Sequence, residues 1–375
     1  MKIAINCRLL LKNKLEGIGW YTFEIVSRIV KNHPEHNFYF LFDRPFHNDF
    51  VFAKNVTPII LYPQSRHPFL WYLWFEFSVP KFLKKNNIDL FFSPDGYLSL
   101  NTNVKTLLTI HDLNFEHFPG QLPFLTRKYY QYFTPKFCKK ADAIITVSQQ
   151  SKKDIVKQYG IEKSKISAIY NGANKMYRPL EEIEKQEVKE KYTDGSDFFY
   201  FVGSLHPRKN IKGLMKGFNQ FCEQTKSDVK LLVIGEPMWK NEETNIVFEK
   251  LEHKNRILFL GRKEMAELTK IAASAIALTF VPFFEGFGIP LAEAMHCHTP
   301  IITSNLSCLP EIARNTAIYA NPNDVNSIAN SMGKMYSNKD KRNELIANCK
   351  IRKTAFSWDK AASEVWKILE QNLPC

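Results

Sequence analysis

The sequence predicts an α/β protein made of two doubly wound domains, each with a parallel sheet between layers of helices. Three observations predict this fold class and its division into two domains. The length of 375 residues suits about two domains of roughly 150 residues. Short β-branched or aromatic runs alternate with amphipathic segments along the whole chain. The charge also differs between the halves, because residues 1–180 carry 25 Lys+Arg and 13 Asp+Glu, whereas residues 181–375 carry 26 and 25.

The predicted strands are apolar runs, as expected of strands that are buried on both faces. In the first half they cover 2–7, 38–42, 88–93, 105–110 and 142–148. In the second half they cover 198–203, 229–235, 256–261, 275–280, 300–303 and 317–320. Segments with helical periodicity lie between the strands, including WYTFEIVSRIVKNH (20–33), NIKGLMKGFNQFCEQ (210–224) and DVNSIANSMGKMY (324–336).

The charged segment 174–197 separates the two series and predicts a linker with a short helix. We therefore expect an N-terminal domain over 1–180 and a C-terminal domain over 195–355. The tail is amphipathic over 356–371, and we expect a helix within 356–375 to pack back on the N-terminal domain. Ligands of such sheets bind at the carboxyl ends of the strands, so two facing domains would form a cleft between those ends.

The composition excludes several classes of protein. With 45% hydrophobic and 24% charged residues, the chain is neither disordered nor collagenous. The net charge of +13 indicates an anionic partner: nucleic acid, a membrane surface or a phosphorylated substrate. Seven cysteines without a C-x-x-C pair fit neither a disulfide framework nor a zinc site. Because no signal peptide and no run of 18 apolar residues is visible, we expect a cytoplasmic protein, or one peripheral on the inner face of the cytoplasmic membrane.

The most informative segment is FFEGFGIPLAEAM (283–295), where a strand runs into a glycine-containing loop and then a helix with Pro290 in its first turn. The N–H groups and the positive end of such a helix form a seat for a diphosphate. Glu285 in the loop and Glu293, eight residues later in the opening turn of the helix, bracket this seat and can accept hydrogen bonds from sugar or ribose hydroxyls. In the structural alternative, Glu293 complements the helix dipole, and Gly286 and Gly288 only form a turn.

A second segment, GSLHPRKN (203–210), also follows a predicted strand directly. Asn210 can cap the next helix, which leaves Arg208 and Lys209 at its N-terminus. Cations are unfavourable there because the helix dipole favours anions, so their placement indicates an anionic ligand. The alternative is that both are solvated surface cations.

Two segments of the first half carry weaker signals. A predicted strand ends directly before His111, which can hydrogen-bond a sugar hydroxyl or the reacting centre. Asp112 would fix the tautomer of this ring or cap the turn, although a strand-end histidine can also be purely structural. Gly17 and Gly19, before the first helix, let the backbone approach a ligand or simply form a turn. Ser148 is either a helix N-cap or faces the ligand.

Motifs of several other enzyme classes are absent from the sequence. It contains no G-x-x-x-x-G-K-[ST], no G-x-S-x-G and no H-E-x-x-H. It also lacks the Asp-x-Asp that a metal-bridged nucleotide-sugar site would use. A metal-free diphosphate site uses cations and helix ends instead, so we expect no metal site and no cofactor.

Together these segments give the chain a resemblance to a known family. It resembles a retaining GT-B glycosyltransferase of the large nucleotide-sugar family that includes bacterial mannosyl- and glucosyltransferases of polysaccharide assembly. The similar segments are IGWYTFEIV, TIHDLNFEHFPG, ITVSQQSKKDI, IYNGAN, YFVGSLHPRKNIKGL and EGFGIPLAEAM, whose Glu-x7-Glu spacing is the hallmark of the family. The PRKN and HDL variants are most similar to the mannosyltransferase-like branch.

The resemblance implies a donor and a role for each candidate in the second half. The donor would be a hexose on GDP, UDP or TDP, whose diphosphate Arg208 and Lys209 would neutralise as the leaving group develops charge. Glu293 would bind the ribose hydroxyls. Glu285 and the backbone of Gly286, Phe287, Gly288 and Ile289 would hold the hexose and the phosphate. Where many relatives have an arginine after the glycine that ends the first C-terminal strand, this chain has Ser204, so Arg208 would supply that charge.

The resemblance also implies that the N-terminal domain receives a saccharide or lipid-linked saccharide acceptor. His111 would contact the sugar near the reaction centre, and Gly17 and Gly19 would close over phosphate or acceptor. The domain contains two aromatic and basic segments, 66–87 and 125–140, which suit an anionic membrane surface. The alternative is that Trp71, Trp74, Phe75 and Phe77 belong to the core and that the lysines form a solvated rim.

Other classes of function remain open on the sequence alone. A nucleotide-sugar epimerase or phosphorylase would have a similar architecture. A non-catalytic basic module would bind membranes or nucleic acid, but no nucleic-acid-binding motif is present and we expect no nucleic-acid partner.

Overall fold

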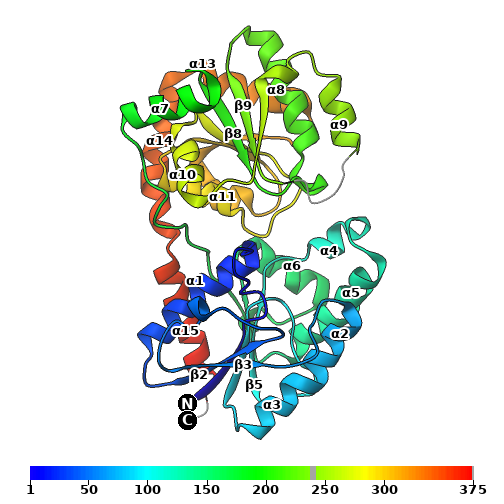
Figure 1. Ribbon diagram of the computed structural model, residues 1–375. Coiled ribbons are helices and arrows are strands. Elements are labelled where there is room, and N and C mark those ends of the chain that lie inside the picture. The colour runs from blue at the N-terminus through cyan, green and yellow to red at the C-terminus, as the bar shows by residue number, and fades with distance from the viewer. Residues whose placement is uncertain (237–241, 374–375) are drawn as a thin grey trace. The chain divides into compact units, whose positions relative to one another are not determined.

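The computed structural model describes residues 1–236 and 242–373, which form two compact units (Figure 1). Unit 1 comprises Met1–Asn171 together with the C-terminal segment from Ser357. Unit 2 comprises Gly172–Phe356. The division falls before the charged segment 174–197, which therefore belongs to unit 2 and contains one of its helices.

Unit 1 is built on a seven-stranded parallel sheet with the strand order β3-β2-β1-β4-β5-β6-β7. Its strands are β1 (Lys2–Asn6), β2 (Asn37–Phe42), β3 (Val56–Ile60), β4 (Leu90–Ser93), β5 (Lys105–Ile110), β6 (Ala143–Thr146) and β7 (Ile166–Ala168). The five central strands were predicted from their apolar runs, and the structure buries almost all of their residues. The two edge strands were not, since Pro58 interrupts the apolar run of β3 and β7 has only three residues.

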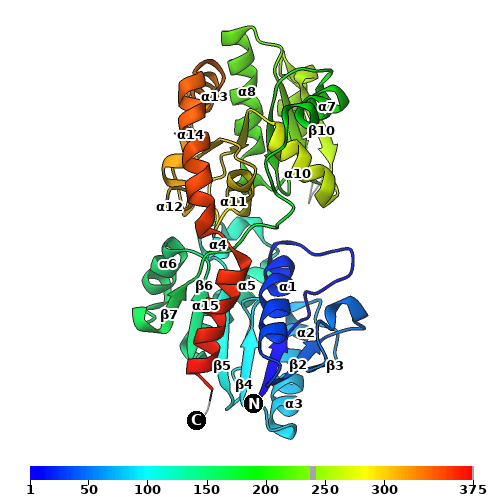
Figure 2. The ribbon, with the colours of Figure 1, turned by 90° about the vertical axis from the view of Figure 1, so that its left-hand side faces the viewer.

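Helices cover both faces of this sheet. They are α1 (Gly17–Asn32), α2 (Pro68–Leu73), α3 (Val79–Lys85), α4 (Asn114–His117), α5 (Phe124–Lys140), α6 (Gln149–Tyr159) and α15 (Trp358–Gln371). A π-helical turn, Trp74–Ser78, connects α2 to α3. The C-terminal helix α15 lies beside α1 (Figure 2), and Trp366 stacks on His33 with ring centroids 3.6 Å apart.

Unit 2 is built on a six-stranded parallel sheet with the order β10-β9-β8-β11-β12-β13. Its strands, all of them predicted, are β8 (Phe198–Val202), β9 (Lys230–Ile234), β10 (Ile257–Gly261), β11 (Ala277–Phe280), β12 (Ile301–Ser304) and β13 (Ala317–Ala320). Its helices are α7 (Glu182–Thr193), α8 (Ile211–Thr225), α9 (Glu242–Glu249), α10 (Met265–Ser274), α11 (Ile289–His296), α12 (Leu309–Ala313), α13 (Val325–Ser337) and α14 (Lys339–Arg352).

The two sheets share one topology, and this confirms the predicted fold class. In unit 1 the strand order reverses between β1 and β4, and in unit 2 it reverses between β8 and β11. At such a reversal the connections leave toward opposite faces, which opens a crevice outside the carboxyl ends of the two central strands. Residues that directly follow β1, β4, β8 and β11 are therefore the first candidates for ligand contact.

Two further findings concern the whole of the described chain. Within residues 1–236 and 242–373, no helix combines the length and the apolar character needed to cross a bilayer. Six cysteines, Cys7, Cys138, Cys222, Cys297, Cys308 and Cys349, are buried and form no disulfide, and Cys375 lies outside the described residues.

Candidate active site

The two segments that the sequence singled out in unit 2 meet at the β8/β11 reversal. Arg208 and Lys209 belong to a short 3-10 turn, Pro207–Lys209, that follows β8. Glu285 belongs to the loop that follows β11. The backbone N–H of Phe283 donates to the carbonyl of Arg208 at 2.9 Å, which fixes one loop against the other.

Both cations contact one carboxylate. Nη1 of Arg208 lies 2.8 Å from Oε1 of Glu285, and Nζ of Lys209 forms an ion pair with the same oxygen. Burial, which leaves Glu285 only 8% exposed, opposes its ionisation, but Lys209 and Arg208 hold the pKa of the carboxyl below its usual range. Glu285 is therefore ionised, and the three groups together carry a net charge of +1.

The loop around Glu285 is held by residues that the sequence analysis missed. The hydroxyl of Ser307 donates to the carbonyl of Glu285 at 2.6 Å and accepts from its N–H at 3.3 Å. Nη1 of Arg208 also donates to the carbonyl of Phe284 at 3.1 Å. Nζ of Lys209 lies 5.0 Å from the centre of the Phe280 ring. These contacts set the positions of both cations before any ligand binds.

Helix α11 begins directly after this loop. Gly288 occupies the N-cap position with φ +84°, a conformation that favours glycine, and an added Cβ would lie 2.9 Å from Cδ2 of Leu309. Pro290 lies in the first turn, as predicted. Gly286 and Phe287 are buried in the loop, and Ile289 is the first residue of the helix. The positive end of α11 therefore begins within four residues of Glu285 in the sequence, as a diphosphate seat requires.

Glu293 lies in the second turn of α11 rather than in the opening turn that we predicted, since the helix starts at Ile289. Burial raises the pKa of its carboxyl to about 7, although the nearby hydroxyl of Tyr177 opposes this rise. Because the helix dipole acts mainly within the first turn, complementing the dipole does not explain this carboxyl. Tyr177 was missed because it lies in the segment that we interpreted as a linker.

Asn210 precedes α8 as predicted, but its side chain does not cap the helix. Its amide nitrogen donates instead to the carbonyls of Val281 (3.1 Å) and Pro322 (2.8 Å), so that it ties the loops after β11 and β13 to the start of α8. The N-cap prediction for this side chain was wrong because both carbonyls come from distant parts of the sequence. Ser204 lies half-buried in the loop after β8.

In unit 1, His111 directly follows β5 and is held in a defined orientation. Its Nε2 lies 2.8 Å from the carbonyl of Pro94, and its ring meets Tyr21 edge-on at 4.7 Å. Burial lowers the pKa of the imidazole, so the neutral ring donates from Nε2 and keeps Nδ1 as an acceptor. Asp112 caps the turn by accepting from the N–H of Asn114 at 3.0 Å, so of the two predicted roles the structure supports this one.

The other predicted residues of unit 1 lie at helix starts. Ser148 is the N-cap of α6, since its hydroxyl accepts from the N–H of Ser151 at 3.0 Å. Gly17 and Gly19 lie in the first turn of α1 and not before it, which corrects the predicted position. A Cβ on Gly19 would lie 2.9 Å from the carbonyl oxygen of Leu9, whereas one on Gly17 would meet nothing within 4 Å.

A buried ion pair at the β1/β4 reversal was missed. Nε of Arg8, two residues after β1, lies 2.6 Å from Oδ2 of Asp95, two residues after β4. The guanidinium lies 4.1 Å from the centre of the Tyr97 ring. The rule that pointed to His111, a polar residue just after a predicted strand, would have identified both residues.

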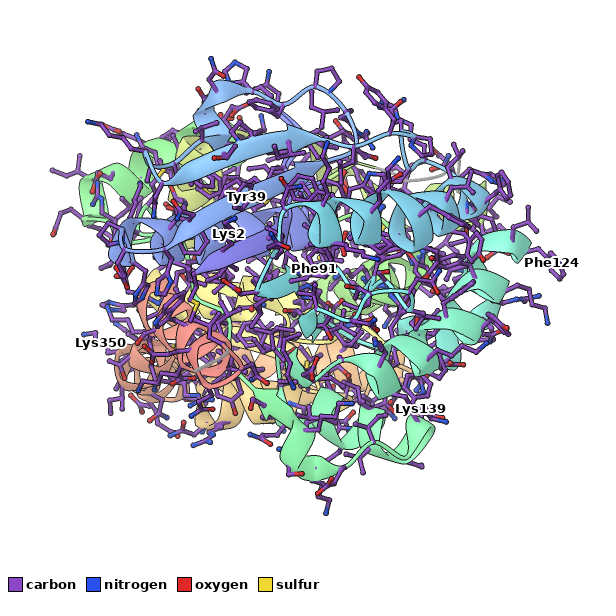
Figure 3. All side chains as sticks on the ribbon, turned by 90° about the horizontal axis from the view of Figure 1, so that it is seen from below. Lys2, Tyr39, Phe91, Phe124, Lys139 and Lys350 are labelled. Carbon is purple, nitrogen blue, oxygen red and sulfur yellow. The ribbon has the colours of Figure 1, made fainter. Side chains whose placement is uncertain are left out.

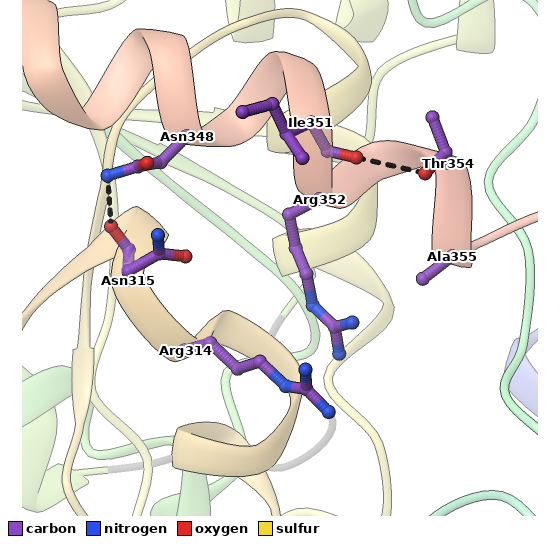
Figure 4. A pocket seen from close by; sticks show the side chains of 7 residues that line it. All are labelled: Arg314, Asn315, Asn348, Ile351, Arg352, Thr354 and Ala355. Carbon is purple, nitrogen blue, oxygen red and sulfur yellow. Dashed lines mark hydrogen bonds between the residues drawn. The ribbon is translucent and has the colours of Figure 1, made fainter.

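Unit 2 also has a pocket of about 290 Å³ (Figure 4). The residues that line it are Arg314, Asn315, Asn348, Ile351, Arg352, Thr354 and Ala355, none of which the sequence analysis had selected. In the described part of the chain, no group of three or more His, Cys, Asp or Glu side chains is arranged to hold a metal ion.

Comparison with known proteins agrees with this architecture. Residues 15–175 match the family described as Glycosyltransferase Family 4, and residues 182–352 match Glycosyl transferases group 1. The O-antigen chain mannosyltransferase RfbU of Salmonella typhimurium is 30% identical over 69% of each chain. The O-antigen chain mannosyltransferase B of Escherichia coli is 25% identical over 73% of this chain and 72% of that protein.

Among solved structures, Anabaena Alr3699/HepE in complex with UDP and glucose has a TM-score of 0.78 at 16% identity, covering 99% of this chain and 100% of that one. The chain therefore belongs to the GT-B glycosyltransferases, in their mannosyltransferase-like branch.

Proposed function

We propose that this glycosyltransferase moves a hexose of the mannose or glucose type from a nucleotide diphosphate sugar to a saccharide or lipid-linked saccharide, with retention and without a metal ion. The observation that carries the proposal is the convergence of Arg208 and Lys209 on Glu285 at the β8/β11 reversal. A net charge of +1, held rigidly beside a helix N-terminus, suits the diphosphate of a leaving nucleotide.

In this proposal unit 2 holds the donor. Arg208 and Lys209 transfer their hydrogen bonds from Glu285 to the diphosphate and stabilise the charge that develops as the glycosidic bond breaks. Glu285, with the backbone of residues 286–289, then accepts hydrogen bonds from the hexose. Glu293 binds the ribose hydroxyls, and the complex of Alr3699/HepE with UDP and glucose supports a nucleotide-sugar donor of this kind. Retention rests on the Glu-x7-Glu pattern of the sequence.

Unit 1 receives the acceptor in this proposal. His111 contacts the sugar near the reaction centre through its Nδ1, and the first turn of α1, with Gly17 and Gly19, approaches the acceptor or a phosphate. The names of the two O-antigen chain mannosyltransferases support a role in cell-surface polysaccharide assembly. A lipid-linked acceptor and the +12 charge of residues 1–180 favour a peripheral position on the inner face of the cytoplasmic membrane.

The test begins with thermal shifts in the presence of GDP, UDP and TDP. We expect one of the three to raise the unfolding temperature, which also identifies the donor base. A product assay with the matching nucleotide sugars then distinguishes transfer to an acceptor from epimerisation or phosphorolysis. If none of the three nucleotides stabilises the protein, or if the donor is consumed without an acceptor, the proposal is wrong.

A further inference from the structure

Unit 1 exposes large apolar side chains on two neighbouring helical segments. One segment runs from α2 through the π-helical turn to α3, and the other is α5, which contacts α2. We call the area that they form the α2–α5 surface. Its most exposed apolar side chains are Phe69 (62%), Phe77 (55%), Phe124 (61%), Leu125 (55%) and Tyr132 (57%).

Ring contacts make part of this area continuous across the two segments. Tyr72 meets Phe77 at 5.9 Å and Phe133 at 5.9 Å, and Phe133 meets Tyr132 at 4.9 Å between ring centroids. Two exposed residues, Phe77 and Tyr132, are thus linked through neighbouring rings rather than scattered singly. A contiguous exposed apolar area of this kind marks an interaction site more often than isolated exposed side chains do.

The structure shows which aromatic residues of 66–87 belong to the core and which are exposed, a question that the sequence left open. Trp74 and Phe75 are fully buried and belong to the core of unit 1, and Trp71 is partly buried against that core. Phe77 points to solvent. The core alternative therefore holds for the inner aromatic residues, whereas the outer ones form the α2–α5 surface.

The exposed charges on these two segments are all positive. Residues 68–85 and 124–140 contain eight cations: Lys81, Lys84, Lys85, Arg127, Lys128, Lys136, Lys139 and Lys140. Their only carboxylate, Glu76, is buried and accepts from the N–H groups of Leu100 and Asn101. Figure 3 shows α5 along the outside of unit 1, with Phe124 and Lys139 labelled near its two ends. The surface therefore presents aromatic and cationic groups, and its own two segments add no exposed carboxylate.

Cations also lie directly against the exposed rings. Nζ of Lys136 is 3.4 Å from the centre of the Tyr132 ring, and Nζ of Lys128 is 5.8 Å from that of Phe124. At a bilayer surface, aromatic rings lie at the boundary between headgroups and acyl chains, and lysines lie at the level of anionic headgroups. Leu125 and Phe69 favour lipid over a polynucleotide, because neither side chain can hydrogen-bond to a base and Leu125 cannot stack on one.

We propose that the α2–α5 surface is the site at which unit 1 lies on an anionic lipid bilayer. This inference rests on the proposed function only for its biological purpose, which is to bring the enzyme to a lipid-linked acceptor. The binding itself needs neither donor nor acceptor, so it can be measured without either.

The test is sedimentation with vesicles of phosphatidylcholine, with and without phosphatidylglycerol. We expect wild-type protein to bind only the vesicles that contain phosphatidylglycerol. Phe77→Ser/Tyr132→Ser should weaken this binding by about tenfold or more, because two aromatic anchors are lost. Lys84→Gln/Lys136→Gln should weaken it by a similar factor of about ten. The matched control is Lys216→Gln/Lys334→Gln, which removes two exposed charges from unit 2 and should change binding by less than about twofold.

Hydrogen–deuterium exchange locates the contact independently, and we expect vesicles to protect amides within 68–85 and 124–140. The proposal would be overturned if all variants bound equally, if both kinds of vesicle were bound equally, or if vesicles protected other amides instead. Binding of single-stranded DNA or RNA in preference to anionic vesicles would also overturn it. An unchanged unfolding temperature shows that the variants are folded. If the protein binds vesicles but no nucleotide, the proposed function fails and this inference stands. If it binds a nucleotide but no vesicles, this inference fails and the proposed function stands.

Discussion

Nη1 of Arg208 lies 2.8 Å from Oε1 of Glu285, although 77 residues separate the two in the sequence. Because Lys209 contacts the same oxygen, one carboxylate lies between the two cations, and in the proposed function the donor diphosphate takes over these contacts. The site is thus organised for an anion before the donor arrives. Catalytic electrostatics of this kind depend on charges that need not reorganise during the reaction.

Arg208→Ala and Lys209→Ala should each lower kcat/KM for transfer by about 10²–10³-fold, because in the proposed function each removes a charge that faces the leaving diphosphate. Initial rates with the cognate nucleotide sugar measure the effect. Lys212→Ala is the matched control, since Lys212 lies in the first turn of α8 and pairs with Glu243 at the surface. Normal turnover in both the Arg208 and the Lys209 variants would exclude the proposed role.

Glu285→Gln should destabilise the protein by about 3–5 kcal/mol, because it leaves two largely buried cations without their carboxylate. Pyrophosphate should then raise the unfolding temperature of this variant more than that of wild type, since it supplies negative charge in place of the lost carboxylate. Scanning calorimetry with and without pyrophosphate measures both effects. An equal response of the two proteins would mean that Arg208 and Lys209 do not bind phosphate.

The fold was predictable because a parallel strand that is buried on both faces is apolar along its whole length. All six strands of unit 2 and the five central strands of unit 1 have this pattern. The edge strands β3 and β7 do not, because Pro58 and the shortness of β7 remove the signal on which the prediction depends.

The candidate site was predictable in its residues but not in its contacts. Arg208, Lys209 and Glu285 were found because each follows a strand, and this position depends only on local sequence. The shared contact with Glu285 and the proximity of Tyr177 to Glu293 are tertiary relationships, which no local pattern specifies. For the same reason the side chain of Asn210 was assigned to a cap, whereas it binds two distant carbonyls.

Glu293 should make the stability of the protein depend on pH. Its pKa is raised from 4.5 to about 7, so between these values the folded protein binds a proton that the unfolded chain releases. The contribution of this group to stability is therefore complete below about pH 4.5 and is lost as the pH rises through 7. When the pH is raised from 4.5 to 8, the free energy of unfolding of wild type should fall by about 1–3 kcal/mol relative to that of Glu293→Gln. Unfolding in urea at each pH measures this difference. Glu187→Gln on the exposed face of α7 is the control, and a constant difference between wild type and Glu293→Gln across this range would contradict the assignment.

His111→Ala should lower kcat by about 10²-fold while leaving nucleotide affinity unchanged, because the ring belongs to unit 1 and the proposed donor-binding residues belong to unit 2. Titration calorimetry with the cognate nucleotide measures the affinity. Burial lowers the pKa of His111 below its usual 6.5, so protonation should reduce the activity of wild type only on the acid side of that value. A weaker nucleotide affinity in the variant would assign His111 to donor binding instead.

Alanine substitutions at Gly17 and Gly19 can distinguish a glycine that is needed for close packing from one that is needed for ligand binding. Gly19→Ala should destabilise unit 1 by about 1–3 kcal/mol, since its Cβ would lie 2.9 Å from the carbonyl oxygen of Leu9. Gly17→Ala meets nothing within 4 Å and lies in the first turn of α1, so it should leave stability unchanged or raise it by up to about 1 kcal/mol. If the start of α1 closes over a phosphate or the acceptor, Gly17→Ala should nevertheless raise the KM for that substrate severalfold. Unfolding in urea and initial rates with both substrates measure the two effects, and full activity of Gly17→Ala would leave Gly19 with a packing role alone.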